Sequence, residues 1–187
     1  MKSNTLKLIR SSSMGAALAL CMLVSFRAAG ADEQRGQLSA HDYKFVVDAA
    51  KGGMAEVTLG KLAAEKAMSP DVKQFGQKMA DDHQKANDEL MKLVSQKGAT
   101  LPTDVTTAEN REVEHLRNLS GADFDKAYMD HMVKDHKKDV KEFEREAKGA
   151  KDTDVQAFAT KTLPTLQEHL RMAEAIDKTA KAEKKAQ

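Results

Sequence analysis

Apolar and small residues recur at helical spacing through four long segments of this chain, and this periodicity constrains the fold more than any other feature. Spacing of this kind is typical of an α-helix that turns one face to a core. The pattern predicts helices over residues 40–67, 70–97, 122–148 and 152–178. Aromatic residues make up only 4% of the chain and Trp is absent, so the composition excludes a sheet protein. We therefore expect an all-α fold.

The links between these segments predict how the helices are connected. Ser69-Pro70 leaves room for only a short turn between the first two helices, which must form an antiparallel hairpin. Gly98 and Pro102 open a long connection, in which a short helix runs from Thr106 to about 119. A second short link joins the last two helices. Two hairpins joined by one long crossover predict a ferritin-like four-helix bundle over residues 40–178.

Two local features refine this prediction. The first helix presents Gly53 and Gly60 on its inner face, so a neighbouring helix can approach closely there. Pro164 lies inside the fourth helix and is expected to kink it, because proline removes one backbone hydrogen bond. Residues Met79–His83 of the second helix and Met132–His136 of the third share the pattern Met-x-x-Asp-His, which is a weak internal sequence similarity.

The first 31 residues have the pattern of a secretory signal peptide. Lys2, Lys7 and Arg10 precede a short apolar run, and Ala29-Gly30-Ala31 supplies a site of small residues for cleavage. The apolar run is too short for a typical membrane-spanning helix, although an uncleaved anchor stays open as an alternative. Cys21 is the only cysteine, but Leu20 before it does not fit a lipidation site. We expect export to the periplasm, a linker over 32–39 and a basic tail over 179–187.

The charge of the mature chain limits its partners. Removing residues 1–31 takes away four basic residues and no acidic ones, which leaves a slight acidic excess. No nucleic-acid partner is expected from such a balance. The lysines of the tail suit a helix end and allow weak contact with an anionic membrane surface. The partner and the oligomeric state stay open.

Four polar residues stand on or beside the apolar stripes, one in each predicted helix: Glu56, His83, His136 and His169. Counted from the hairpin turns at about 1.5 Å per residue, the first three lie at nearly the same level near the middle of the bundle. The same count displaces His169 by roughly 7 Å. We expect these four side chains to converge, which is how helix bundles build metal sites.

The residue types decide which metals fit such a site. A carboxylate-bridged di-iron centre needs Glu-x-x-His pairs, and none of the three histidines has an acid three positions before it. Asp82, Asp135 and Glu168 flank the histidines but point about 100° away on the helix. A mononuclear copper or zinc site of the four residues is chemically sensible. Each histidine also has a methionine one turn away, which suits copper(I): Met79, Met132 and Met172.

A second interpretation assigns no ligand role to these residues. Buried histidines are often held by hydrogen bonds to carboxylates or backbone, and buried methionines commonly fill a core. His41, His115 and His131 are expected to be peripheral from their positions in the pattern. Tyr43 and Tyr128 are expected to pack with their hydroxyl groups at the edge of the core. No nucleophile motif is present and the mature chain has no thiol, so we expect a role other than enzymatic catalysis.

Spaced matches through all four helices resemble a widespread family of exported bacterial proteins. The most specific are Asp48–Glu56, Leu59–Ala67 and Val72–His83, followed by Leu101-Pro102, Phe124–Tyr128, His136 and Leu163–Leu170. The family is a domain of unknown function with a ferritin-like fold, and its members are often described as membrane or outer-membrane proteins. The resemblance covers about residues 40–178 and implies the fold and an envelope location. It implies no reaction, and it associates Glu56, His83, His136 and His169 with the family motif.

Two functions are compatible with these observations. The first is a periplasmic bundle that binds or buffers a transition metal at the mid-bundle site. The second is an envelope interaction or stress-protective protein whose histidines are structural and whose charged helix faces bind a partner. Loss of metal uptake on histidine substitution would distinguish the first from the second.

Overall fold

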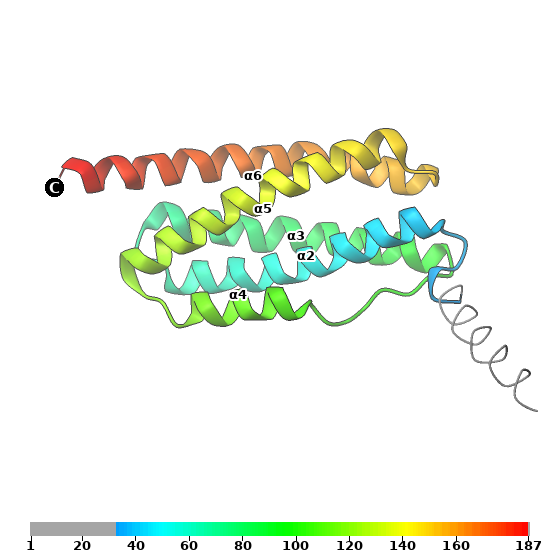
Figure 1. The fold of residues 1–187 in the computed structure, drawn as a ribbon, viewed down its shortest axis with the longest axis horizontal. Helices are drawn as coiled ribbons and strands as arrows, with labels where there is room; N and C mark the ends of the chain where they lie inside the picture. The colour runs from blue at the N-terminus through cyan, green and yellow to red at the C-terminus, as the bar shows by residue number, and fades with distance from the viewer. Residues whose placement is uncertain (1–32, 187) are drawn as a thin grey trace, which may run out of the picture. The chain divides into compact units, whose positions relative to one another are not determined.

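The computed structural model describes residues 33–186, with side chains described through residue 179, and every regular element in this range is a helix. The elements are α2 (Ala40–Lys66), α3 (Pro70–Gln96), α4 (Thr107–Arg117), α5 (Gly121–Gly149) and α6 (Thr153–Ala186). The short helix α4 lies in the crossover between α3 and α5 (Figure 1). The predicted all-α fold, with a short helix in the crossover, is confirmed.

Two helical hairpins form the unit Arg35–Gln187. The first pairs α2 with α3 and the second pairs α5 with α6, while α3 also contacts α6 and α2 also contacts α5 (Figure 1). The crossover carries α4, which packs against α2 and α5. Thr106 and Glu109 form the predicted capping box at the start of α4, so the end of the crossover is anchored by its own side chains.

The core consists of two apolar clusters. One contains Leu59, Met79, Met132 and Ala173, and the other contains Ala50, Leu90, Phe143 and Leu166, each taken from α2, α3, α5 and α6 in turn. On each of the four helices, one polar residue lies between the members of the two clusters: Glu56, His83, His136 and His169. A buried polar layer therefore crosses the bundle between its two apolar halves.

An aspartate from each hairpin holds the turn of the other. Asp42 at the start of α2 accepts hydrogen bonds from the backbone N–H groups of Lys151 and Asp152, at 3.0 and 3.1 Å. Asp125 near the start of α5 accepts from the N–H groups of Met68 and Ser69, at 2.9 and 2.7 Å. Both carboxylates are buried. Each satisfies donors that a helix start leaves without an intrahelical partner.

The two hairpins are related by an internal repeat. Residues in equivalent places are separated by the same number of positions along the chain: Asp42 and Asp125, Phe45 and Tyr128, Glu56 and Asp139, Val72 and Val155, Phe75 and Phe158. The Ala67 and Ala150 C-caps also share one backbone conformation. This repeat equates α2 with α5 and α3 with α6. The similarity between Met79–His83 and Met132–His136 pairs α3 with α5 and is not part of this repeat.

The end of α6 differs from the prediction. α6 continues to Ala186, beyond the predicted end near residue 178, and is uninterrupted at Pro164. No helix among the described residues has both the length and the hydropathy to cross a membrane. The proposed signal peptide and Cys21 lie outside the described residues, and the boundaries of the linker and the tail stay predictions.

The predicted close approach on the small face of α2 is confirmed at Gly60. A Cβ at this position would lie 2.6 Å from the carbonyl oxygen of Gly76 and 2.8 Å from the backbone nitrogen of Ala80. Both atoms belong to the backbone of α3 and cannot move aside like the end of a flexible side chain. Gly52, about two turns earlier on α2, would meet nothing within 4 Å.

We predict that Gly60→Ala lowers the free energy of unfolding by about 2 kcal/mol, because the added methyl forces α2 away from α3. Gly52→Ala is the matched control and should raise the stability by about 0.5–1 kcal/mol, since alanine is the better helix former in open space. Urea unfolding followed by circular dichroism measures both. Equal effects of the two substitutions would contradict the close approach of the helices.

Candidate metal centre

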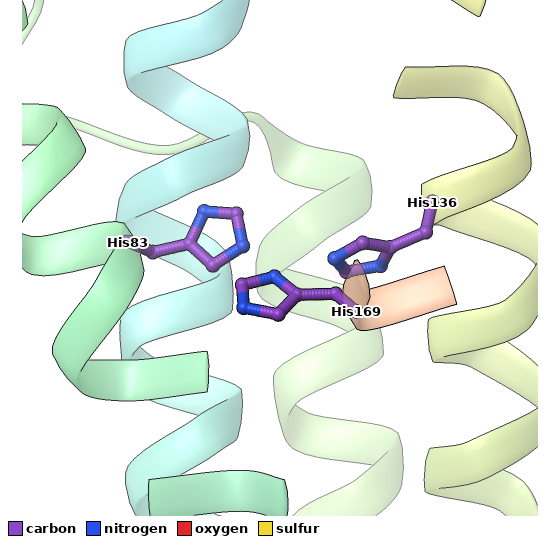
Figure 2. Close-up of side chains that lie close together, drawn as sticks. All are labelled: His83, His136 and His169. Atoms are coloured by element: carbon purple, nitrogen blue, oxygen red, sulfur yellow. The ribbon is translucent and has the colours of Figure 1, made fainter. Parts of the chain in front are cut away.

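Three histidines from three helices converge in the polar layer. His83 on α3, His136 on α5 and His169 on α6 point toward one another (Figure 2). The ring centroids of His83 and His136 are 5.8 Å apart, and that of His169 is 5.4 Å from each. His83 is 7% exposed, and His136 and His169 are 0% exposed. The site is therefore an almost dry cluster of three imidazoles.

The predicted displacement of His169 by roughly 7 Å is wrong. That estimate counted Cα positions from the second hairpin turn, but a helical side chain leans toward the N-terminus of its helix. His136 on α5 therefore leans away from the turn, and His169 on the antiparallel α6 leans toward it. These opposite tilts bring the two rings to one level although His169 lies further from the turn along the chain.

Oxygen acceptors hold the outer nitrogens of two of the rings. The Nδ1 atom of His136 is 3.0 Å from the carbonyl oxygen of Met132, which can only accept a hydrogen bond. The Nε2 atom of His169 is 3.0 Å from Oδ2 of Asp82. Although burial acts to raise the pKa of Asp82, hydrogen bonds from Lys78 and His169 lower it, so this carboxylate is ionised and accepts. Both rings therefore carry their proton on the outer nitrogen.

Glu56 occupies the corresponding place beside His83. Its Oε2 atom is 3.1 Å from Nδ1 of His83, and its Oε1 atom is 3.5 Å from Nδ1 of His136. An ionised Glu56 accepts the Nδ1 proton of His83 and leaves the Nε2 lone pair of this ring directed inward. The carboxylate thus lies behind two of the rings, on their Nδ1 side, and orients the ring of His83.

The inner nitrogens have no hydrogen-bond partner among the described residues. These atoms are Nε2 of His83, Nε2 of His136 and Nδ1 of His169, all fully buried. One ring nitrogen from each histidine lies within 4.8 Å of those of the other two. Zinc–nitrogen bonds of about 2.0–2.1 Å in tetrahedral geometry require any two ligand nitrogens to be about 3.4 Å apart. A modest contraction would bring three nitrogens onto one ion.

Burial keeps the three rings neutral. It lowers the pKa of His136 to about 3, with a further contribution from His169, while the hydrogen bond to Met132 opposes the change. Burial also lowers the pKa of His83 well below its usual range and that of His169, where Asp82 opposes the change. Neutral imidazole is the form that binds metal ions, so the environment suits coordination at neutral pH.

The pKa of Glu56, the carboxylate behind the rings, is shifted upward. Burial raises the pKa of Glu56 well above its usual range, and the nearby charges of Asp139 and Asp135 raise it further. A protonated Glu56 would donate to Nδ1 of His83 and move the proton of that ring to the inner nitrogen. The arrangement with three inward lone pairs is therefore the one in which Glu56 is ionised.

The other residues singled out from the sequence lie around this centre. Met79 and Met132 are fully buried in one apolar cluster, and Met172 packs against it, so their role as ligands stays a prediction. The Tyr43 hydroxyl donates to the carbonyl oxygen of Thr100 at 2.9 Å. Tyr128 is fully buried rather than at the edge of the core, and its hydroxyl has no partner among the described residues.

The peripheral histidines are placed away from the trio. His115 is exposed on α4, and His131 lies 3.8 Å from a carboxylate oxygen of Glu112. His41 is also exposed, with Nε2 at 2.9 Å from Oε2 of the buried Glu146. His41, Asp42 and Glu146 form a second group of potential ligand atoms. Asp42 in this group already accepts three hydrogen bonds, from the backbone N–H groups of Lys151 and Asp152 and from the Ser39 hydroxyl.

Sequence reasoning missed three acidic residues of the site. Asp82 does point away from His83, its neighbour in sequence, but it reaches His169 on the adjacent helix. Asp135 and Asp139 lie near Glu56, with one carboxylate oxygen from each of the three within 4.8 Å of the others. The spacing of these two aspartates, one turn apart beside His136, was a readable signal. The reach of Asp82 depends on helix rotation, which the sequence does not specify.

A cavity of about 490 Å³ leads to one edge of the centre. Its lining includes His83, Glu56, Asp135 and Asp139, whereas His136 and His169 are not part of it. Seven acidic side chains and three lysines contribute to the wall. The cavity wall beside His83 is therefore mainly acidic and attracts cations.

Fold and site together define an all-helical bundle with a buried trihistidine cluster. A family model described as "Domain of unknown function (DUF4142)" matches residues 27–176, and the chain belongs to this family. No curated protein matches the chain. The crystal structure of a DUF305 fragment from Deinococcus radiodurans is similar, with a TM-score of 0.67 and 13% identity over 76% of this chain and 98% of the fragment. This likeness supports the helical fold.

The depressed pKa of His136 predicts acid sensitivity of the metal-free protein. Above pH 6.5 the ring is neutral in both states, whereas below it the unfolded chain takes up a proton that the folded protein refuses until about pH 3. Stability is therefore lost as pH falls through this window, by about 2 kcal/mol for this residue between pH 7 and pH 5. The raised pKa values of Glu56 and Asp139 act in the opposite sense.

The contribution of His136 to the pH dependence of stability is measured by comparing the parent protein with a variant that lacks this ring. Urea unfolding at pH 7 and pH 5, with a chelator present, should give a change in stability that is about 2 kcal/mol smaller in His136→Asn. His115→Asn removes an exposed histidine and should leave the change as in the parent protein. An unaltered pH response in His136→Asn would show that this ring titrates normally in the folded state.

Proposed function

We propose that this protein binds one late first-row transition-metal ion, copper or zinc, through the inner nitrogens of His83, His136 and His169. The single observation that carries the proposal is the convergence of three buried ring nitrogens that have no hydrogen-bond partner among the described residues. Buried polar atoms are otherwise nearly always satisfied. With Glu56 ionised, all three inner nitrogens carry lone pairs, and a buried water molecule, which donates only two hydrogen bonds, would leave one of them unsatisfied.

The outer contacts support a ligand role. Metal-binding histidines usually donate their other ring N–H to a carboxylate or a backbone carbonyl, which fixes the tautomer and the ring orientation. His169 has Asp82 in this role and His136 has the Met132 carbonyl, while Glu56 stands beside His83. Each ring thus has its own orienting oxygen.

The donor set favours copper or zinc over other ions. Imidazole is a borderline ligand that suits both, and the Irving–Williams order gives them the highest affinities among divalent first-row ions. Three nitrogens leave a fourth tetrahedral position open. The methionines next to the site would add thioether ligands for copper(I) only if their side chains turned out of the apolar cluster.

The proposed setting is the periplasm, which rests on the signal-peptide pattern of residues 1–31. In that compartment a protein without mature cysteines could hold or buffer a transition metal without thiol chemistry. The function proposed is therefore metal binding or buffering in the cell envelope. The alternative is that the three histidines are structural core residues that bind no metal, and each test below distinguishes the two.

We predict uptake of one copper or zinc ion per chain by the apo protein covering Asp32–Gln187. Titration with Zn(II), Cu(II) and Cu(I) followed by elemental analysis gives the stoichiometry. His169→Ala should abolish this uptake, whereas His115→Ala, which removes an exposed histidine, should not change it. Thermal unfolding of the apo variants checks that the bundle is intact.

The metal should also stabilise the folded protein, because the unfolded chain has no preformed site. A higher melting temperature on adding one equivalent of metal, absent in His169→Ala, is the expected companion result. No uptake at micromolar concentration by the folded parent protein would contradict the proposal and leave the histidines as core residues.

We further predict that Asp82→Ala weakens metal binding by about 10–100-fold without removing a ligand, since it releases the orienting contact to Nε2 of His169. Asp81→Ala is the matched control, because Asp81 is the exposed neighbour of Asp82 on α3. Competition against a chromophoric chelator measures both affinities. An affinity in Asp82→Ala equal to that of the control would exclude the orienting role.

A further inference from the structure

Three carboxylates form a second cluster next to the histidines. Glu56 comes from α2, and Asp135 and Asp139 are one turn apart on α5. One carboxylate oxygen from each lies within 4.8 Å of the other two. Like charges this close repel each other, and they are costly to keep together unless a cation lies among them or a proton neutralises one of them.

The compensation that the protein itself supplies is small. The Nζ atom of Lys138 is 3.8 Å from Oδ1 of Asp139, at the limit of an ion pair, and the side chain of Asp139 is 18% exposed. The cavity that contains the three carboxylates is acidic as a whole, with seven acidic side chains against three lysines. A dense negative charge around a hollow of about 490 Å³ attracts a cation and leaves space for its water ligands.

A separate observation points to a ligand at this place. Glu56 is only 2% exposed, and its Oε1 atom has no hydrogen-bond partner among the residues that the structure describes. The residue lines the same cavity as Asp135 and Asp139. Its other oxygen, Oε2, is next to His83. Oε1 lies 3.5 Å from Nδ1 of His136, but the proton of that nitrogen is already held by the Met132 carbonyl. This buried carboxylate oxygen therefore has no hydrogen-bond donor and is available to a cation in the cavity.

We propose that Glu56, Asp135 and Asp139 form a second cation site, which binds a hard divalent ion such as Mn²⁺ or Mg²⁺. Three carboxylates offer only oxygen, the donor that these ions prefer over nitrogen and sulfur. The remaining positions of an octahedral ion would be filled by water from the cavity, since Mn²⁺ and Mg²⁺ sites commonly retain several waters.

The second site differs from the trihistidine site in ligand chemistry and in position. The histidine nitrogens that face inward belong to His83, His136 and His169. Glu56, the carboxylate that Asp135 and Asp139 approach, lies on the opposite side, at the Nδ1 atoms of His83 and His136. Glu56 is the residue common to both surroundings: it orients His83 with one oxygen and offers the other to the cavity. The carboxylate site can therefore exist whether or not the trihistidine site binds a metal.

The test is a Mn²⁺ titration of the folded apo protein, followed by the loss of the free Mn²⁺ signal in electron paramagnetic resonance. We expect one bound Mn²⁺ per chain, and none at the same concentrations in Asp135→Asn/Asp139→Asn. Asp81→Asn/Asp88→Asn is the matched control: it removes the same charge from two exposed aspartates of α3 and should retain the Mn²⁺. The single variant Asp139→Asn provides a milder substitution, and circular dichroism checks that each variant is folded.

A zinc titration of the same variants separates the two sites. Asp135→Asn/Asp139→Asn should still take up one Zn²⁺ at the histidines, and His169→Ala should still bind Mn²⁺ at the carboxylates. Mn²⁺ binding that is absent from the parent protein, or equal in the Asp135/Asp139 and Asp81/Asp88 double variants, would overturn the second site. That result would leave the trihistidine site to be judged by its own zinc uptake.

Discussion

The structure depends on a buried polar layer that has to be satisfied in the middle of an apolar bundle. Each of the four long helices contributes one residue to this layer, and the two apolar clusters lie on either side of it. Any slip of one helix against another would separate His83 from Glu56 or His169 from Asp82 and bury their polar atoms without partners. The layer therefore fixes the register of the hairpins, while Asp42 and Asp125 hold the turns at both ends.

The helices and their order followed from the sequence because their signals are local. Periodicity, the Ser69-Pro70 start and the Thr106–Glu109 capping box each act over a few residues, and the helix bounds came within a few positions except at the end of α6. The polar layer was visible for the same reason, since His136 and His169 interrupt apolar stripes. The structure brings both of them to the same cluster.

The contacts between helices were beyond reach because they depend on rotation and on side-chain direction. Asp82 was set aside since it points away from its own neighbour, yet it reaches His169 across the interface of α3 and α6. His169 was placed too far along its helix because only Cα heights were counted. Glu56 was expected among the ligands of one centre, but the structure puts it behind two rings and beside Asp139, its counterpart in the internal repeat. That repeat was readable from the sequence and would have drawn attention to Asp139.

The central claim is that the three inner nitrogens surround a metal ion rather than water. The most direct measurement is a crystal structure of protein purified without a metal-binding tag, with diffraction data collected above and below the zinc and copper absorption edges. The account predicts one anomalous peak about 2.0–2.1 Å from Nε2 of His83, Nε2 of His136 and Nδ1 of His169. A water molecule there with no anomalous signal, in protein that also takes up no added copper or zinc, would contradict it.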